Sequence, residues 1–176
     1  VAPTALTAST KFAAGTSLPA QAWLDAFFVA GRKLLSRIPQ FKVLALAISG
    51  NGPSLVPSTA QGQDLAPLHW HEPVDSAYLG IGGPSFFLPA VSQFFDQRKE
   101  DAKKTFRFLS SQEWLSHKLG AEAFTTLPGP DYRPWYWTDE QIEARGLKPS
   151  LFPPLVEPGS IVGQLDEKAK QQLLLH

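Results

Sequence analysis

The chain has 176 residues, and its 16 basic and 16 acidic side chains cancel at neutral pH. This length fits one domain, so residues 1–176 are treated as a single domain. A balanced charge creates no global field toward nucleic acid, which argues against a nucleic-acid partner. Cysteine is absent, which excludes disulfides, thiolate metal sites and cysteine nucleophiles.

The first residues have an unusual composition. Residues 1–16 are rich in Ala, Ser and Thr and contain no acidic side chain, a composition typical of organellar transit peptides. They predict a flexible or extended N-terminal arm. The chain also has no methionine. We therefore interpret it as the mature form of an organelle-imported protein, with a fragment of a longer chain as the alternative.

The first predicted helix runs from Ser17 to Pro39, with apolar residues spaced three or four apart from Trp23 onward. The apolar run 41–50 favours a strand by its length and flanking breakers, although its Leu-Ala-Leu-Ala pattern could also continue a helix. Residues 51–74 contain four prolines and show no periodicity. They predict a long connection, either a functional loop or an arm laid over a neighbour.

A second helical region is predicted to begin at Pro84 and to continue through the charged stretch 96–108, where oppositely charged residues are spaced for ion pairs on one face. Capping boxes are predicted at Ser110 with Glu113 and at Thr138 with Gln141. Each marks the start of a short helix.

An uncharged stretch, residues 76–95, is long enough to cross a bilayer. Its glycines and prolines would leave backbone groups unsatisfied in lipid, so a buried or interface-facing segment is the favoured interpretation. Residues 149–162 predict a Pro-rich connector before a C-terminal helix. The predicted fold class is mainly α: several short-to-medium helices joined by long, ordered, Pro-rich extended segments, with little or no β-sheet.

The sequence PLHWHEPVD comes nearest to a reactive site. His69 and His71 lie two apart in an extended segment and so point to one side, where both could reach one metal ion with Asp75 adding an oxygen. The string H-x-H-x3-D-x6-G over residues 69–82 resembles the first metal-binding motif of the cupin family. No second cupin motif follows, so the family is not assigned. The open alternative is a Pro-bounded loop whose histidines bond backbone carbonyls.

Other catalytic patterns are missing from the sequence. It contains no dinucleotide fingerprint, no phosphate loop, no G-x-S-x-G elbow, no H-E-x-x-H and no EF-hand loop.

Aromatic residues gather on the first helix, in SFFLPAVSQFF and in DYRPWYW. Large exposed apolar patches mark interaction sites, and Trp and Tyr dominate interface hot spots. The predicted partner-interface residues are Trp23, Phe27, Phe86, Phe87, Phe94, Phe95, Tyr132, Trp135, Tyr136 and Trp137. Packing of these side chains inside their own chain is the alternative.

These features favour a non-catalytic accessory subunit of a large organellar complex, photosynthetic or respiratory. Such a subunit would stabilise the assembly through aromatic anchors and extended arms, peripheral to the thylakoid or mitochondrial inner membrane and in contact with other protein subunits. In a photosynthetic host, His69 or His71 is a candidate ligand for chlorophyll magnesium. The alternatives are a small soluble metal-dependent enzyme or metal-binding protein using the His-Trp-His segment, and a small-ligand binding module.

Overall fold

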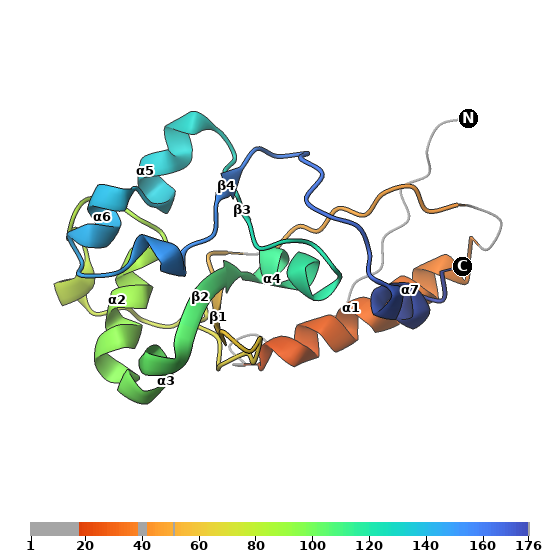
Figure 1. The fold of residues 1–176 in the computed structure, drawn as a ribbon, viewed down its shortest axis with the longest axis horizontal. Helices are drawn as coiled ribbons and strands as arrows, with labels where there is room; N and C mark the ends of the chain where they lie inside the picture. The colour runs from red at the N-terminus through yellow and green to blue at the C-terminus, as the bar shows by residue number, and fades with distance from the viewer. Residues whose placement is uncertain (1–17, 39–41, 51, 176) are drawn as a thin grey trace.

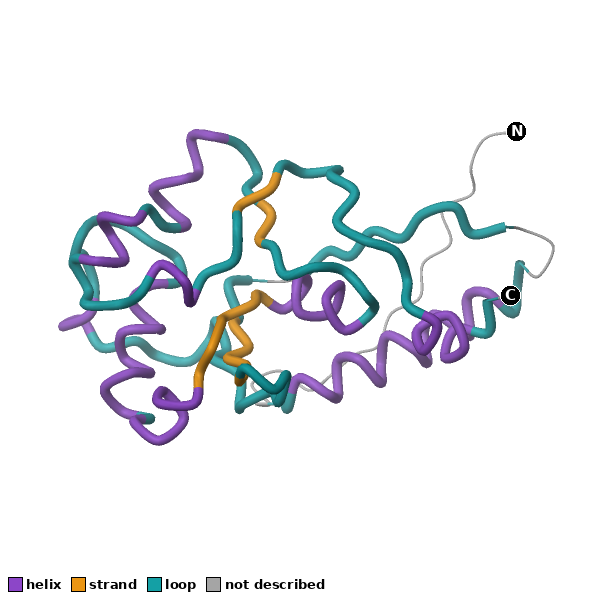
Figure 2. The backbone as a smooth tube through the Cα atoms, viewed as in Figure 1, coloured by secondary structure: helices purple, strands orange, loops and turns teal. Residues whose placement is uncertain are grey.

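The computed structural model describes residues 18–38, 42–50 and 52–175. Helices dominate this part of the chain, and its strands form two small sheets (Figures 1 and 2). In chain order the elements are α1 (Ala20–Leu35), β1 (Leu55–Thr59), η1 (Ser76–Tyr78), α2 (Leu88–Gln97), α3 (Lys99–Lys104), β2 (Thr105–Ser110), α4 (Ser111–Lys118), β3 (Thr125–Thr126), η2 (Pro130–Tyr132), α5 (Arg133–Tyr136), α6 (Asp139–Glu143), η3 (Pro149–Leu151), β4 (Leu155–Val156) and α7 (Glu167–Leu173). The mainly helical character with little sheet is confirmed.

Helix α1 confirms the first predicted helix. It begins after Pro19, whose extended backbone suits the N-cap, and it ends at Leu35 with Arg32 and Lys33 in the last turn, where the helix dipole favours cations. The predicted limits Ser17 and Pro39 lie outside the described residues. The helix packs against α4 and α7 (Figure 1). Most of its apolar stripe is only half-buried.

The antiparallel pair β1–β2 separates two hydrophobic clusters. Leu55 and Phe108 face the larger cluster, while Val56 and Leu109 belong to a smaller cluster with α1 and α4. Successive strand residues point to opposite faces, and a hydrophobic cluster covers each face of β1. This explains why all five residues of β1 are buried.

Both strands lie where the sequence predicted another structure. The stretch 51–74 was predicted to lack structure because of its prolines, yet β1 includes Pro57, whose carbonyl accepts from the Leu65 N–H at 2.8 Å. The charged stretch 96–108 was predicted to be helical, but the helix ends at Lys104 and β2 begins at Thr105. The alternation Thr-Phe-Arg-Phe is a strand signal that the preceding charge run obscured.

Two helix starts also differ from prediction. Helix α2 begins at Leu88, with Pro89 rather than Pro84 in its first turn. At α4 the Ser110 side chain makes no capping hydrogen bond, and the side chain of Glu113, its predicted partner, is buried and accepts from the Thr126 N–H at 3.0 Å.

Several local predictions are confirmed. The capping box of Thr138 and Gln141 starts α6. The C-terminal helix is α7, and a predicted ion pair joins Lys103 to Glu100 at 2.6 Å. None of the helices within the described ranges has the length and apolarity that a membrane crossing requires. Residues 1–16, the predicted arm, lie outside the described residues.

The larger cluster holds most of the core and draws on the middle and the last third of the chain. Trp137 lies 5.0 Å from Phe152, and Phe152 stacks on Phe108 at 6.0 Å between ring centroids. The predicted connector 149–162 contributes here: its first residues form η3, and its strand β4 pairs in parallel with β3. The segment between β3 and β4 therefore leaves the sheet and returns to it.

Candidate functional site

A groove of about 630 Å³ lies beside the start of α1. Its polar side chains are Gln21, Asp64, His69, Glu72 and Arg98. Its apolar wall consists of Leu18, Pro19, Ala20, Leu65, Ala66 and Pro67. Hydrogen-bond donors and acceptors thus line one concave surface together with apolar side chains.

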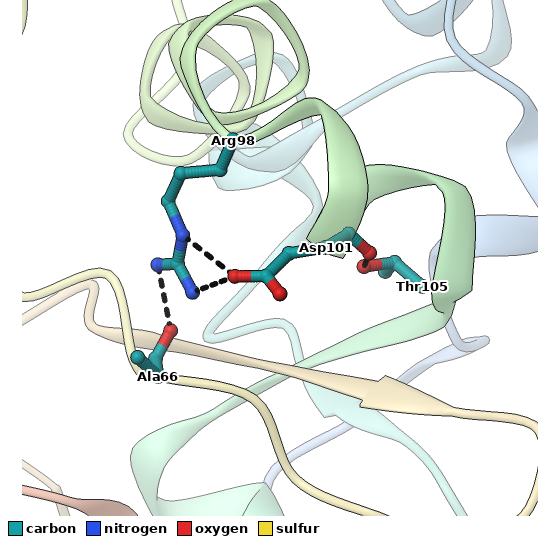
Figure 3. A network of polar contacts seen from close by, with 4 residues as sticks. All are labelled: Ala66, Arg98, Asp101 and Thr105. Atoms are coloured by element: carbon teal, nitrogen blue, oxygen red, sulfur yellow. Dashed lines mark hydrogen bonds and ion pairs between the residues drawn. The ribbon is translucent and has the colours of Figure 1, made fainter.

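Arg98 is held rigidly at one end of the groove, at the junction of α2 and α3. Its Nε and Nη2 donate to Asp101 Oδ2 at 3.1 and 2.7 Å, and its Nη1 donates to the Ala66 carbonyl at 2.9 Å (Figure 3). The guanidinium also lies 4.8 Å above the Phe94 ring, a cation–π geometry. The Thr105 hydroxyl donates to the Asp101 carbonyl at 2.9 Å and ties this turn to the start of β2.

Asp64 is fixed from two sides. Its Oδ2 lies 2.9 Å from Lys118 Nζ on α4, and its Oδ1 accepts from the Ser58 hydroxyl at 3.1 Å. Carboxylate oxygens have more than one lone pair, so Asp64 keeps acceptor capacity after both contacts. The ion pair joins the 59–64 turn to α4 and orients the carboxylate in the groove wall.

His69 packs between aromatic rings. Its ring stacks on His71 at 5.3 Å with an interplanar angle of 28°, and the edge of Trp23 approaches it at 5.8 Å. Burial lowers the pKa of His69, while the nearby Glu72 carboxylate works in the opposite direction. His69 therefore favours the neutral imidazole, with one donor and one acceptor nitrogen.

The structure gives the predicted metal site no geometric support. Asp75 instead caps η1, since its Oδ1 accepts from the Ala77 N–H at 2.9 Å and its own N–H donates to Gln93 at 2.8 Å. Within residues 18–38, 42–50 and 52–175, no three His, Asp or Glu side chains gather as metal ligands. His69 and His71 come together as a ring stack, and Asp75 does not complete a ligand set with them.

The predicted interface aromatics divide into three groups by burial. Phe87, Phe94 and Trp137 are 5, 2 and 6% exposed and belong to the core, which corrects the part of the interface prediction that included them. The half-buried side chains are Trp23, Phe27, Phe95 and Tyr136. The exposed side chains are Phe86, Tyr132 and Trp135. Neighbouring rings of one local sequence therefore separate into core and surface, because the chain turns between them.

The exposed aromatics include one ordered pair. Phe86 stacks on Trp135 at 5.5 Å with an interplanar angle of 21°, and the Phe86 N–H donates to the Trp135 carbonyl at 2.8 Å. Each ring covers one face of the other, which reduces the apolar surface left open to a partner.

Of the polar side chains in the groove, His69 was among the predicted site residues and Glu72 lies in the same segment, whereas Gln21, Asp64 and Arg98 were missed. These three come from the first turn of α1, the loop after β1 and the end of α2. No spacing rule connects residues that are this far apart in the chain. The only local signal was the sequence Gln61-Gly62-Gln63-Asp64, in which Gly and Asp are typical turn residues and indicate a turn at Asp64.

Compared with models of known protein families and with curated protein sequences, the chain has no match. Solved structures do match it. A ligand-bound xylulose kinase from Lactobacillus acidophilus superposes with a TM-score of 0.75 at 13% identity, over 90% of this chain. A gluconate kinase from the same organism gives 0.76 at 13% identity over 97%, and a xyloylose kinase from Brucella ovis gives 0.75 at 16% over 97%.

At such low identity the likeness establishes the fold: the chain folds like part of these sugar kinases. It spans 37, 39 and 40% of the length of the three matched proteins. Nearly all of this chain therefore corresponds to less than half of each kinase.

Proposed function

We propose that this chain is part of a carbohydrate kinase and contributes its sugar-binding side. The observation that carries the proposal is the superposition of 90–97% of the chain on structures described as xylulose, xyloylose and gluconate kinases. The substrate class is accordingly a small sugar or sugar acid. This proposal differs from the sequence-based preference for a chain without catalysis, which stays a prediction.

The groove chemistry fits a polyhydroxylated ligand. Each sugar hydroxyl both donates and accepts, so a sugar site needs both kinds of partner on one surface. Asp64 and Glu72 supply acceptors, and Arg98 and Gln21 supply donors. The ring N–H of neutral His69 bonds the Leu18 backbone, so His69 adds one acceptor nitrogen. Because Arg98 and Asp64 are already anchored by Asp101 and Lys118, their geometry is set before a ligand arrives. Such preorganisation lowers the entropy cost of binding.

Phosphoryl transfer also needs a phosphate cradle, a metal-bound nucleotide and a group that accepts the sugar proton. The sequence carries no recognisable phosphate loop. In this proposal, the nucleotide-binding machinery belongs to polypeptide outside these 176 residues. The matched kinases, of which this chain spans about two fifths, have room for it.

The test is a coupled assay of ADP formation. The polypeptide encoded by the complete reading frame is incubated with MgATP and with xylulose, gluconate and other pentoses and hexoses. We expect sugar-dependent ADP formation above the sugar-free background. If no sugar raises ADP formation, the proposal fails.

A groove variant sharpens the assay. Glu72→Gln replaces a charged acceptor by a neutral one, so we expect the sugar KM to rise about tenfold with kcat nearly unchanged. Glu157→Gln, on an exposed turn after β4, is the matched control and leaves KM unchanged. Equal KM values for the two variants would contradict a sugar-binding role for the groove.

The accessory-subunit hypothesis, with its organellar location and subunit partners, stays a prediction that the fold comparisons do not test. This hypothesis now depends on the exposed aromatic side chains of Phe86, Tyr132 and Trp135. Native mass spectrometry of the source material tests it directly, because a stable complex would reveal the partner masses.

A further inference from the structure

Residues 42–50 form an extended apolar segment between α1 and β1. Leu44 is 86% exposed and Leu46 is 44% exposed, and most neighbours in the segment are exposed as well. Throughout the described ranges, no N–H or C=O of residues 42–50 takes part in a hydrogen bond. Figure 2 accordingly draws the segment as loop.

The sequence of this segment is not that of a surface loop. It contains none of the turn residues Pro, Asn or Asp, and glycine comes only at its end. In an extended chain, alternate side chains point to opposite faces. One face carries Val43, Ala45 and Ala47, and the other carries Leu44, Leu46 and Ile48. A strand that is apolar on both faces is typical of the inside of a parallel sheet covered on both sides.

The position of the segment supports the same interpretation. It follows helix α1, and a helix followed by an apolar strand is the second half of a strand–helix–strand unit, whose two strands pair in parallel. Its far end lies against the start of α4, where a Cβ added at Gly50 would collide with the Gln112 side chain. Gly52 has a φ of +74° and packs on Trp70. The segment therefore enters the fold at a defined point and direction.

We propose that residues 43–49 are an inner strand of a larger sheet, whose partner strands belong to the same polypeptide outside these 176 residues. Among residues 18–38, 42–50 and 52–175, neither edge of the segment has a hydrogen-bonded partner, and both faces are apolar. Pairing with a second copy of this chain would satisfy one edge only and would leave the apolar faces uncovered. The matched kinases have well over half of their length outside the matched region, which is enough chain for additional strands.

This inference rests on backbone geometry and goes beyond the proposed kinase function. A sheet completed in this way would cover Leu44 and Leu46 and the exposed side of α1, where Val29 is 57% exposed.

Backbone hydrogen–deuterium exchange tests the proposal on two proteins: the 176-residue chain and the polypeptide of the complete reading frame. Amides of residues 43–49 should exchange at least ~100-fold more slowly in the complete polypeptide. Fast exchange in the complete polypeptide would overturn the proposal. Protection in the monomeric 176-residue chain would also overturn it, since the partner would then lie within residues 1–176. If protection of residues 43–49 rose as the chain dimerised, the partner strand would belong to a second copy, and the proposal would be wrong.

A pair of variants gives an independent readout. Leu44→Lys and Ile161→Lys make the same change at positions that are 86 and 94% exposed in this chain. In the complete polypeptide we expect Leu44→Lys to lower Tm by roughly 5 °C or more and Ile161→Lys to leave it nearly unchanged. Equal Tm values would refute the buried strand. A failed kinase assay together with protected amides would reject the proposed function and leave this strand assignment standing.

Discussion

Glu113 is a buried carboxyl whose replacement by glutamine should change how stability depends on pH. The side chain is 1% exposed, its Oε1 accepts from the Thr126 N–H at 3.0 Å, and its Oε2 has no partner among the described residues. Burial raises the pKa of Glu113 above its ordinary value of 4.5, and the Thr126 hydrogen bonds offset only part of this shift.

The sign of the pH effect follows from this raised pKa. The unfolded chain loses the Glu113 proton near pH 4.5, whereas the folded chain keeps it to higher pH. The stabilisation associated with this proton is complete below pH 4.5 and is lost as the pH rises through the folded pKa. Above its folded pKa, Glu113 is a poorly solvated charge with one oxygen unpartnered among the described residues, which costs about 1–3 kcal/mol.

In Glu113→Gln the bond from Thr126 is kept and the charge is removed, but the new amide N–H2 group also needs an acceptor. We therefore expect a net gain of about 1 kcal/mol at pH 7, or roughly 2–4 °C in Tm. Urea denaturation from pH 4 to pH 8 measures the effect, with the exposed Glu122→Gln as the control. Parallel stability curves for wild type and Glu113→Gln would refute the reasoning.

Two further predictions concern local contacts. Thr138→Ala removes the hydroxyl that accepts from the Gln141 N–H at 3.3 Å, so it should destabilise the chain by about 1 kcal/mol in thermal unfolding; an unchanged Tm would show that the capping box contributes nothing. Asp101→Ala breaks the ion pair with Arg98, whose side chains are 36 and 28% exposed, so the loss should stay below about 1 kcal/mol and shrink in 1 M NaCl. A larger, salt-independent loss would mean that Arg98 positions the loop at Ala66 by more than charge pairing.

The sequence predicts those parts of the fold that depend on neighbouring residues. Helix α1 follows from apolar spacing, and the start of α6 follows from the Thr138–Gln141 pair, because capping involves residues three apart. The pair β1–β2 was missed because its register joins Leu55 to Ser110, a contact between distant residues that no local pattern encodes. Pro57 locally indicated an irregular connection, and the charge run before Thr105 locally indicated a helix.

The same limit applies to the groove. His69 was predicted as a site residue from its own segment, which also contains Glu72. Arg98 seemed to be one member of a solvated charge run until the turn between α2 and α3 brought it to the Ala66 carbonyl. The division of the aromatics into core and surface likewise depends on the turns around Phe86 and Trp137, which the composition of the segment does not show.

The parallel pairing of β3 with β4 has a consequence for the region between them. Thr125 pairs with Leu155 and Thr126 with Val156, so residues 127–154 leave and re-enter the molecule at adjacent points. Both ends are anchored, and Trp137 packs on Phe152 across the excursion. A peptide bond cut within it, for example at exposed Lys148, would leave two fragments that remain associated through the strand pair and the rings. The strand pair and the ring packing, rather than the unbroken backbone, therefore hold residues 127–154 in place.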